Sequence, residues 1–152
     1  MTASVATSSA PMVDAERLLS ILGRVTARLR ILEGYALQDR DDLLGDRVRL
    51  GDLKYTFQTA IEACIDAAQH AVADQGLGVP SSNADAFRLL GGADLLDDGL
   101  AKALAGAVGF RNVLVHDYVE VDDAAVVANL QRLDELRRFV GAMSRLVDPH
   151  VR

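Results

Sequence analysis

An arginine, a histidine and a tyrosine lie close together in one otherwise apolar run, Phe110–Tyr118. Arg111 precedes His116 by five residues, and Tyr118 follows His116 by two. A guanidinium can bind two phosphate oxygens at once, and an imidazole can accept or release a proton near neutral pH. Together these groups suit the cleavage of a phosphodiester bond, so we take Arg111 and His116 as a candidate catalytic pair.

The element that must position this pair is a helix that begins near Asp94–Asp98, where carboxylates can cap its first turn. On a wheel of about 100° per residue, Arg111 falls in the middle of an arc of apolar residues. These residues are Leu100, Leu104, Ala107, Leu114 and Val115. An arginine at this position is costly to bury unless it has a partner or lines a cavity.

His116 lies about 140° from Arg111 around an unbroken helix, so one straight helix cannot easily direct both side chains at one phosphate. We therefore expect the helix to end near His116 and a second copy of the chain to complete the site across a two-fold axis. Gly106 and Gly109 are unfavourable inside a helix. Their presence indicates close approach by another backbone, such as that of the partner subunit.

Each of these residues also has a structural alternative. The segment Val113–Val121 alternates between apolar and polar residues, as in a half-buried strand, but a single strand among helices would have nothing to pair with. Arg111 could pair with a carboxylate in the core. His116 could interact with the dipole at the C-terminus of a helix. Tyr118 could be an aromatic residue of an interface.

The remainder of the chain is also patterned as helix. Apolar residues recur at alternating spacings of three and four, which is typical of helices packed lengthwise against neighbours. The charged segment Gln38–Leu50 is interpreted as a connection, and Gln75–Asn83 as a loop. The sequence therefore predicts an all-α fold, an up-and-down bundle of four long helices plus a short helix. The expected helices are Asp14–Tyr35, Gly51–Ala73, the short Ala84–Leu90, the helix of the candidate pair, and a last helix from Asp122 or Asp123 to Val147.

The length of 152 residues favours a single domain. We expect it to occupy residues 13–148, after a disordered tail over residues 1–12 that is rich in Ser, Thr and Ala. No apolar run is long enough to span a bilayer, and the tail lacks the basic and apolar regions of a signal peptide. The lone Cys64 excludes an internal disulfide and suits a reducing compartment. We therefore predict a cytoplasmic protein that does not associate with membranes.

The formal net charge of −6 argues against broad, sequence-blind binding of nucleic acid. A nucleic-acid substrate would have to be attracted by a local basic patch. Arg17, Arg24 and Arg28 fall on one stripe beside the apolar seam of the first helix, since offsets of seven and four return to the same face. This stripe could be a solvated flank or a set of contacts for phosphates.

The motif and its surroundings resemble a known family. R-N-V-L-V-H-D-Y, preceded by Gly109–Phe110, is similar to the R-x-x-x-x-H-x-Y signature of HepT-like proteins of the HEPN superfamily. The run Ala60–Asp66 is similar to part of the second helix of that family. The resemblance covers about Asp14 to Val147, which is nearly all of the chain except the tail.

The resemblance implies a helical homodimer whose two motifs meet at a dimer cleft. It also implies the toxin of a toxin–antitoxin pair, a metal-independent endoribonuclease that cleaves tRNA or mRNA without a cofactor. Arg111 and His116 would be the catalytic pair, and Asn112 would steady the substrate or the histidine. Tyr118 would be the residue that an MntA-like minimal nucleotidyltransferase antitoxin adenylylates to silence the nuclease.

Two other functional classes are compatible with a helical bundle of this size. One is a catalytically inactive dimeric protein that binds a nucleotidyltransferase partner or a nucleotide, which the intact motif disfavours. The other is a metalloenzyme, which is poorly supported because no group of histidines and carboxylates has the spacing of metal ligands.

Overall fold

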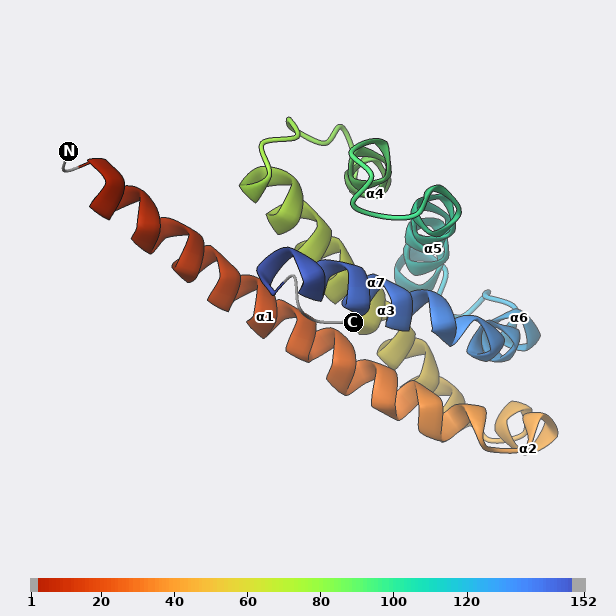
Figure 1. The fold of residues 1–152 in the computed structure, drawn as a ribbon. Coiled ribbons are helices and arrows are strands. Elements are labelled where there is room, and N and C mark those ends of the chain that lie inside the picture. The colour runs from red at the N-terminus through yellow and green to blue at the C-terminus, as the bar shows by residue number, and fades with distance from the viewer. Residues whose placement is uncertain (1–2, 149–152) are drawn as a thin grey trace.

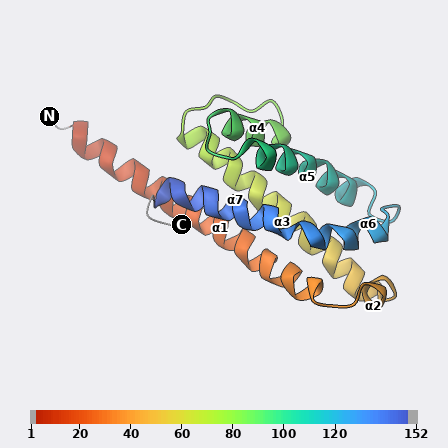
Figure 2. The ribbon, with the colours of Figure 1, turned by 45° about the vertical axis from the view of Figure 1, so that its right-hand side comes forward.

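The computed structural model describes residues 3–148, with side chains from residue 15 onward, and this part of the chain folds entirely into helices and connecting loops. The four long helices run up and down along the bundle, each reversing the direction of the previous one (Figures 1 and 2). The predicted all-α bundle is thereby confirmed. The elements are α1 (Ala3–Ala36), α2 (Arg40–Leu44), α3 (Arg47–Asp74), α4 (Asn83–Gly92), α5 (Asp98–His116), α6 (Asp123–Ala128), the 3-10 helix η1 (Asn129–Arg132) and α7 (Leu133–Val147).

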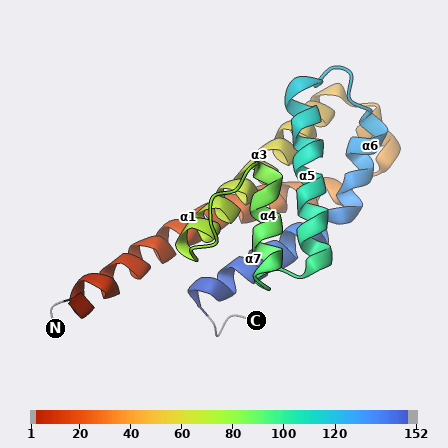
Figure 3. The ribbon, with the colours of Figure 1, turned by 90° about the horizontal axis from the view of Figure 1, so that it is seen from above.

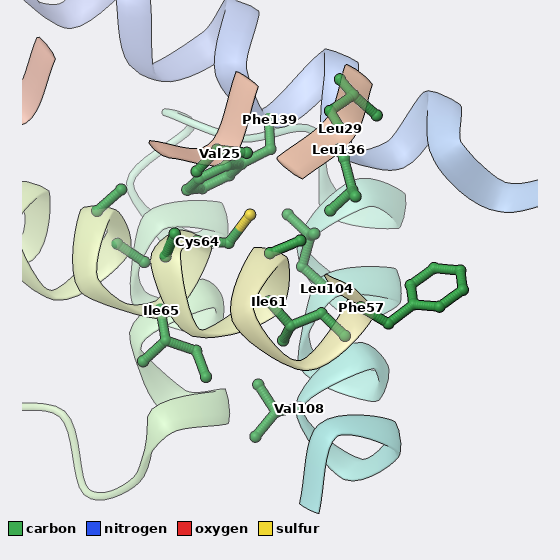
Figure 4. Packing of buried hydrophobic residues seen from close by; sticks show 14 of the residues in the cluster. Val25, Leu29, Phe57, Ile61, Cys64, Ile65, Leu104, Val108, Leu136 and Phe139 are labelled. Atoms are coloured by element: carbon green, nitrogen blue, oxygen red, sulfur yellow. The ribbon is translucent and has the colours of Figure 1, made fainter. Parts of the chain in front are cut away.

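Helix α3 is the centre of the arrangement, because it contacts each of the other six α-helices. Its sequence explains this role, since two apolar stripes wrap around it and many of their residues are alanines that allow close approach. The buried residues of α3 belong to the same cluster as those of α1, α5 and α7. Figure 4 shows this core, with Ile61 and Cys64 of α3 between Val25 of α1, Phe139 of α7 and Leu104 of α5.

The apolar residues that recur at spacings of three and four along the predicted helices are the residues that the fold buries. Val25 and Leu32 of α1 are fully buried, as are Leu53 and Ala60 of α3. Cys64 is also buried, and this burial raises the pKa of its thiol to about 12. A thiol that stays protonated is a poor nucleophile, so Cys64 has a structural role in the packed core.

The charged segment Gln38–Leu50 is more ordered than the connection we predicted. It contains helix α2, and α3 already begins at Arg47 rather than near Gly51. Asp39 accepts hydrogen bonds from the amides of Asp41 and Asp42, so its side chain caps α2. Aspartates in a segment that we interpreted as a connection are thus helix caps.

The predicted last helix is interrupted. Asp122 caps α6, with its carboxylate accepting from the amide of Ala124 at 3.0 Å. The chain then tightens into η1 before α7 begins at Leu133. The side chain of Asn129 donates to the carbonyl of Ala125 at 2.9 Å, and such side-chain hydrogen bonds compete with the helical backbone pattern.

Helix α4 extends past the two glycines that we expected to stop it, so that Gly91 and Gly92 are its last residues. Gly91 is required for packing, because a Cβ at this position would lie 2.8 Å from the Cβ of Ala101 on α5. The absence of a side chain therefore lets α4 and α5 lie in close contact. In Figure 3, both helices are seen in front of α3.

Helix α1 continues back to Ala3, through residues that we assigned to a disordered tail over 1–12, and its first turns extend beyond the other helices (Figure 1). Met1, Thr2 and the side chains of residues 3–14 lie outside the described part of the chain, so the tail stays a prediction. Within the described residues, none of the helices combines the length and the apolar character that crossing a membrane requires.

Candidate active site

Arg111 lies on the side of α5 that faces α3. Phe110, the preceding residue, packs edge-on against Phe57 of α3 with 5.5 Å between the ring centroids. This contact sets the rotation of α5 against α3. It directs the next side chain toward Glu62, which lies on α3 about one turn and a half after Phe57.

The guanidinium of Arg111 is held by two polar residues. Its Nε and Nη2 both donate to Oε2 of Glu62, at 3.0 and 2.8 Å, while Nη1 donates to Oδ1 of Asn112 at 3.0 Å. The Arg111 side chain is 24% exposed. The carboxylate partner that we considered as a structural alternative therefore exists, yet the guanidinium still reaches the surface.

That surface is an open groove of about 710 Å³ between α1, α3, α5 and the start of α4. Arg24 and Arg28, two of the three arginines on the predicted stripe, line it together with Arg111. Arg17 lines an adjoining hollow that shares Arg24 with the groove. The stripe thus runs along the same surface as the candidate catalytic arginine, and a role for it in binding phosphates stays a prediction.

The charges in the groove are nearly balanced, with a small positive excess. Three arginines line it against two carboxylates, those of Glu62 and Asp66. Asp66 accepts from Nη2 of Arg24 at 3.2 Å. At the α4 end, the groove is lined by the uncharged side chains of Gln69 and Asn83. The amide of Gln69 donates to Oδ1 of Asn83 at 2.8 Å. A chain with a formal net charge of −6 therefore has a groove here whose lining contains one more arginine than carboxylates.

His116 is the last residue of α5, as expected, and its side chain is exposed. It does not line the groove that contains Arg111. Because α5 is helical through His116, the two side chains leave the helix about 140° apart. The structure of one chain therefore does not bring the predicted catalytic pair together.

The side of α5 that carries His116 faces solvent. Gly109, Asn112 and Val113 are exposed on the same side. A Cβ at Gly106 or Gly109 would meet no atom within 4 Å. The close backbone approach that these glycines predicted is thus not made within the described part of this chain. Val115, which we placed on the apolar arc, is also 40% exposed.

Tyr118 lies in the loop between α5 and α6, with 43% of its surface exposed. The segment Val113–Val121 is accordingly the end of a helix followed by a turn, and not a strand. Nζ of Lys54 lies 4.9 Å from the centroid of the Tyr118 ring. Tyr118 is separate from the arginine groove and lines a different hollow, of about 310 Å³.

Glu62 and Lys54 are the functional candidates that the sequence did not reveal. Glu62 contacts Arg111, which is 49 positions away, and Lys54 contacts Tyr118, which is 64 positions away. No local spacing in the sequence relates the members of either pair. The only signal was indirect, since an arginine on an apolar arc requires some carboxylate partner. Among the described residues, no three or more His, Cys, Asp or Glu side chains are grouped so that they could hold a metal ion.

Comparisons with known proteins point to one family. A family model described as "Ribonuclease HepT-like" matches residues 25–143. The mRNA nuclease HepT of Shewanella oneidensis is 35% identical over 124 residues, covering 80% of this chain and 90% of that protein. The tRNA nuclease HepT of Aphanizomenon flos-aquae is 32% identical over 107 residues, covering 70% of this chain and 71% of that protein.

Solved structures agree with the sequence comparisons. The tri-AMPylated Shewanella oneidensis HEPN toxin, in complex with an MNT antitoxin, superposes with a TM-score of 0.76 at 28% identity, covering 82% of this chain and 94% of that one. A toxin–antitoxin structure with AMP-PNP has the same TM-score and identity, covering 83% of this chain and 96% of that one. The resemblance inferred from the motif is thus confirmed, and the chain belongs to the HepT-like ribonuclease family.

Proposed function

We propose that this chain is the toxin of a toxin–antitoxin pair and acts as a metal-independent endoribonuclease on mRNA or tRNA in the cytoplasm. The observation that carries the proposal is the guanidinium of Arg111, which Glu62 and Asn112 hold in place at the edge of a groove lined by further arginines. The proposal is supported by the relatives, which are described as an mRNA nuclease and a tRNA nuclease.

The side chains are suited to cleavage by the RNA's own 2′-hydroxyl. The 2′-oxygen attacks the adjacent phosphorus, the new O2′–P bond forms, and the P–O5′ bond breaks. One imidazole accepts the proton of the 2′-hydroxyl, and another donates a proton to the leaving 5′-oxygen. Arg111 binds the non-bridging oxygens and offsets the charge that develops on them, while Asn112 steadies the guanidinium.

The site requires two protomers. Arg111 and His116 of one chain leave α5 on different sides, and the side with His116 is exposed and carries two glycines with open space around them. A second copy packed on this side would bring its own α5 close and place its His116 near the cleft. Two copies of His116 would then supply the acid and the base that the reaction needs.

Regulation would act through Tyr118. An MntA-like minimal nucleotidyltransferase would adenylylate its hydroxyl and thereby silence the nuclease. This part of the proposal is supported by the similar Shewanella oneidensis toxin, whose structure is described as tri-AMPylated and in complex with an MNT antitoxin. The exposed ring of Tyr118 is accessible to such an enzyme.

Replacing Arg111 or His116 by alanine tests the catalytic pair. We expect either variant to lower RNA cleavage at least ~10²-fold and to abolish growth arrest on expression, since each removes a group that acts in the transition state. Arg145→Ala, at an exposed arginine of α7, is the matched control and should cleave normally. Persistent growth arrest with both variants would show that this pair does not catalyse cleavage.

Mixed dimers test whether the site is shared. Wild-type protomers and protomers with His116→Ala are purified together through two different tags. If one reaction uses the histidines of both protomers, the mixed dimer lacks either the acid or the base and should cleave about as slowly as the His116→Ala homodimer. About half of the wild-type activity in the mixed dimer would mean that each histidine acts without its counterpart.

The ends of the RNA products test the reaction itself. Attack by the 2′-hydroxyl should leave a 2′,3′-cyclic phosphate on one fragment and a 5′-hydroxyl on the other, and EDTA should not slow cleavage. Mass spectrometry of a short synthetic RNA identifies both ends. Strong inhibition by EDTA, or cleavage of an RNA with a 2′-deoxy residue at the scissile position, would contradict the proposed chemistry.

Glu62→Gln tests whether the carboxylate orients Arg111. The amide keeps the shape of the side chain but weakens the ion pair, so we expect kcat to fall roughly tenfold through misplacement of the guanidinium. KM for RNA should not rise, because the groove loses a negative charge. Asp66→Asn, at the partner of Arg24, removes the same charge without touching Arg111. An unchanged kcat in Glu62→Gln would show that the carboxylate does not orient Arg111.

A further inference from the structure

Lys54 is a buried lysine of α3, positioned beneath the loop that carries Tyr118. Its side chain is only 10% exposed, which is unusual because lysines are rarely buried without a specific partner. Nζ lies 2.7 Å from Oδ1 of Asp123, the first residue of α6. It donates to the backbone carbonyl of Tyr118 at 3.4 Å. It also lies over the Tyr118 ring, at the 4.9 Å distance of a cation–π contact.

These contacts link α3 to both ends of the α5–α6 loop. The backbone hydrogen bonds of the loop itself are local: the amide of Asp117 donates to Val113, and the amides of Glu120 and Val121 donate to Asp117. Lys54 adds a connection to a helix that is far away in sequence. An ammonium has three N–H groups to donate. The contacts with Asp123 and with the carbonyl of Tyr118 use most of this hydrogen-bonding capacity, so little is left for an external ligand.

The hydroxyl of Tyr118 lies over Gly51, three residues before Lys54 on the same side of α3. A Cβ built at Gly51 would lie 3.1 Å from this hydroxyl, which is closer than side chains normally approach. Lys54 therefore holds the ring, and Gly51 leaves room for the oxygen. Both residues line the hollow of about 310 Å³ that also contains Arg47.

We propose that Lys54 is a positioning residue for nucleotidyl transfer to Tyr118, and that Gly51 provides the space its hydroxyl needs; the inference rests on the proposed function. In the transfer, the Tyr118 oxygen attacks the α-phosphorus of a nucleoside triphosphate bound by the partner transferase. The O–P bond forms, the bond to the β-phosphate oxygen breaks, pyrophosphate leaves, and the phenolic proton passes to water. An acceptor held in one orientation reaches this geometry more often than one on a free loop.

The test compares rates of modification. The chain is incubated with ATP and a minimal nucleotidyltransferase of the MNT class, and intact mass is followed over time. We expect Lys54→Met to lower kcat for transfer roughly 10²-fold with little change in KM for the toxin. Lys54→Arg, which keeps the charge and the contact with the ring, should recover most of this loss. Lys102→Met, at the only other lysine of the chain, is the control and should be modified normally.

Gly51→Ala separates positioning from stability. Alanine favours helix over glycine, so this variant should melt no lower than the wild type, yet its methyl group should displace the hydroxyl and slow transfer. If Lys54→Met does not fold, the rate of transfer to Gly51→Ala tests the inference by itself. Transfer at the wild-type rate in a folded Lys54→Met, or in Gly51→Ala, would overturn the inference.

Failure of the underlying function has a different signature. If the wild type gains no mass, or if Tyr118→Phe gains as much mass as the wild type, Tyr118 is not the acceptor and the proposed regulation falls together with this inference. A wild type that is modified, a Tyr118→Phe that is not, and a Lys54→Met that is modified slowly would support both.

Discussion

The ion pair between Arg111 and Glu62 is the contact on which the candidate site depends. A guanidinium on the apolar side of α5 would be costly without a partner, and both Nε and Nη2 donate to the same carboxylate oxygen. The pair thus satisfies one edge of the guanidinium and leaves the remainder directed at Asn112 and the groove. The same contact therefore offsets the cost of partly burying the arginine and fixes the direction in which its guanidinium points.

Helix α3 connects this site with the loop that carries Tyr118. Glu62 and Lys54 are eight residues apart on one continuous helix, and each holds a residue of the motif. The segment of α3 between these two residues is about 12 Å long, and it fixes the distance between the groove and the Tyr118 loop. Because α3 also contacts every other α-helix, both regions are anchored to the helix at the centre of the core.

The electrostatics of the chain are arranged locally. The overall charge is negative, but arginines gather along one groove, where two of them are paired with carboxylates. Such pairing limits the attraction for a polyanion at long range and keeps the guanidinium groups in place at short range. The RNA binding proposed for this groove would therefore depend on short-range contacts with its arginines.

The sequence by itself determined the helical class, the buried seams, the end of α5 at His116, and the need of Arg111 for a partner, because these follow from periodicity and from the properties of single residues. It did not determine α2 or the break before α7, where short side-chain hydrogen bonds from Asp39 and Asn129 decide the backbone. Only the tertiary structure identified Glu62 and Lys54, whereas the separation of His116 from Arg111 agrees with the helix geometry expected from the sequence. Residues 49 or 64 positions apart are brought together by packing against α3, which no local pattern encodes.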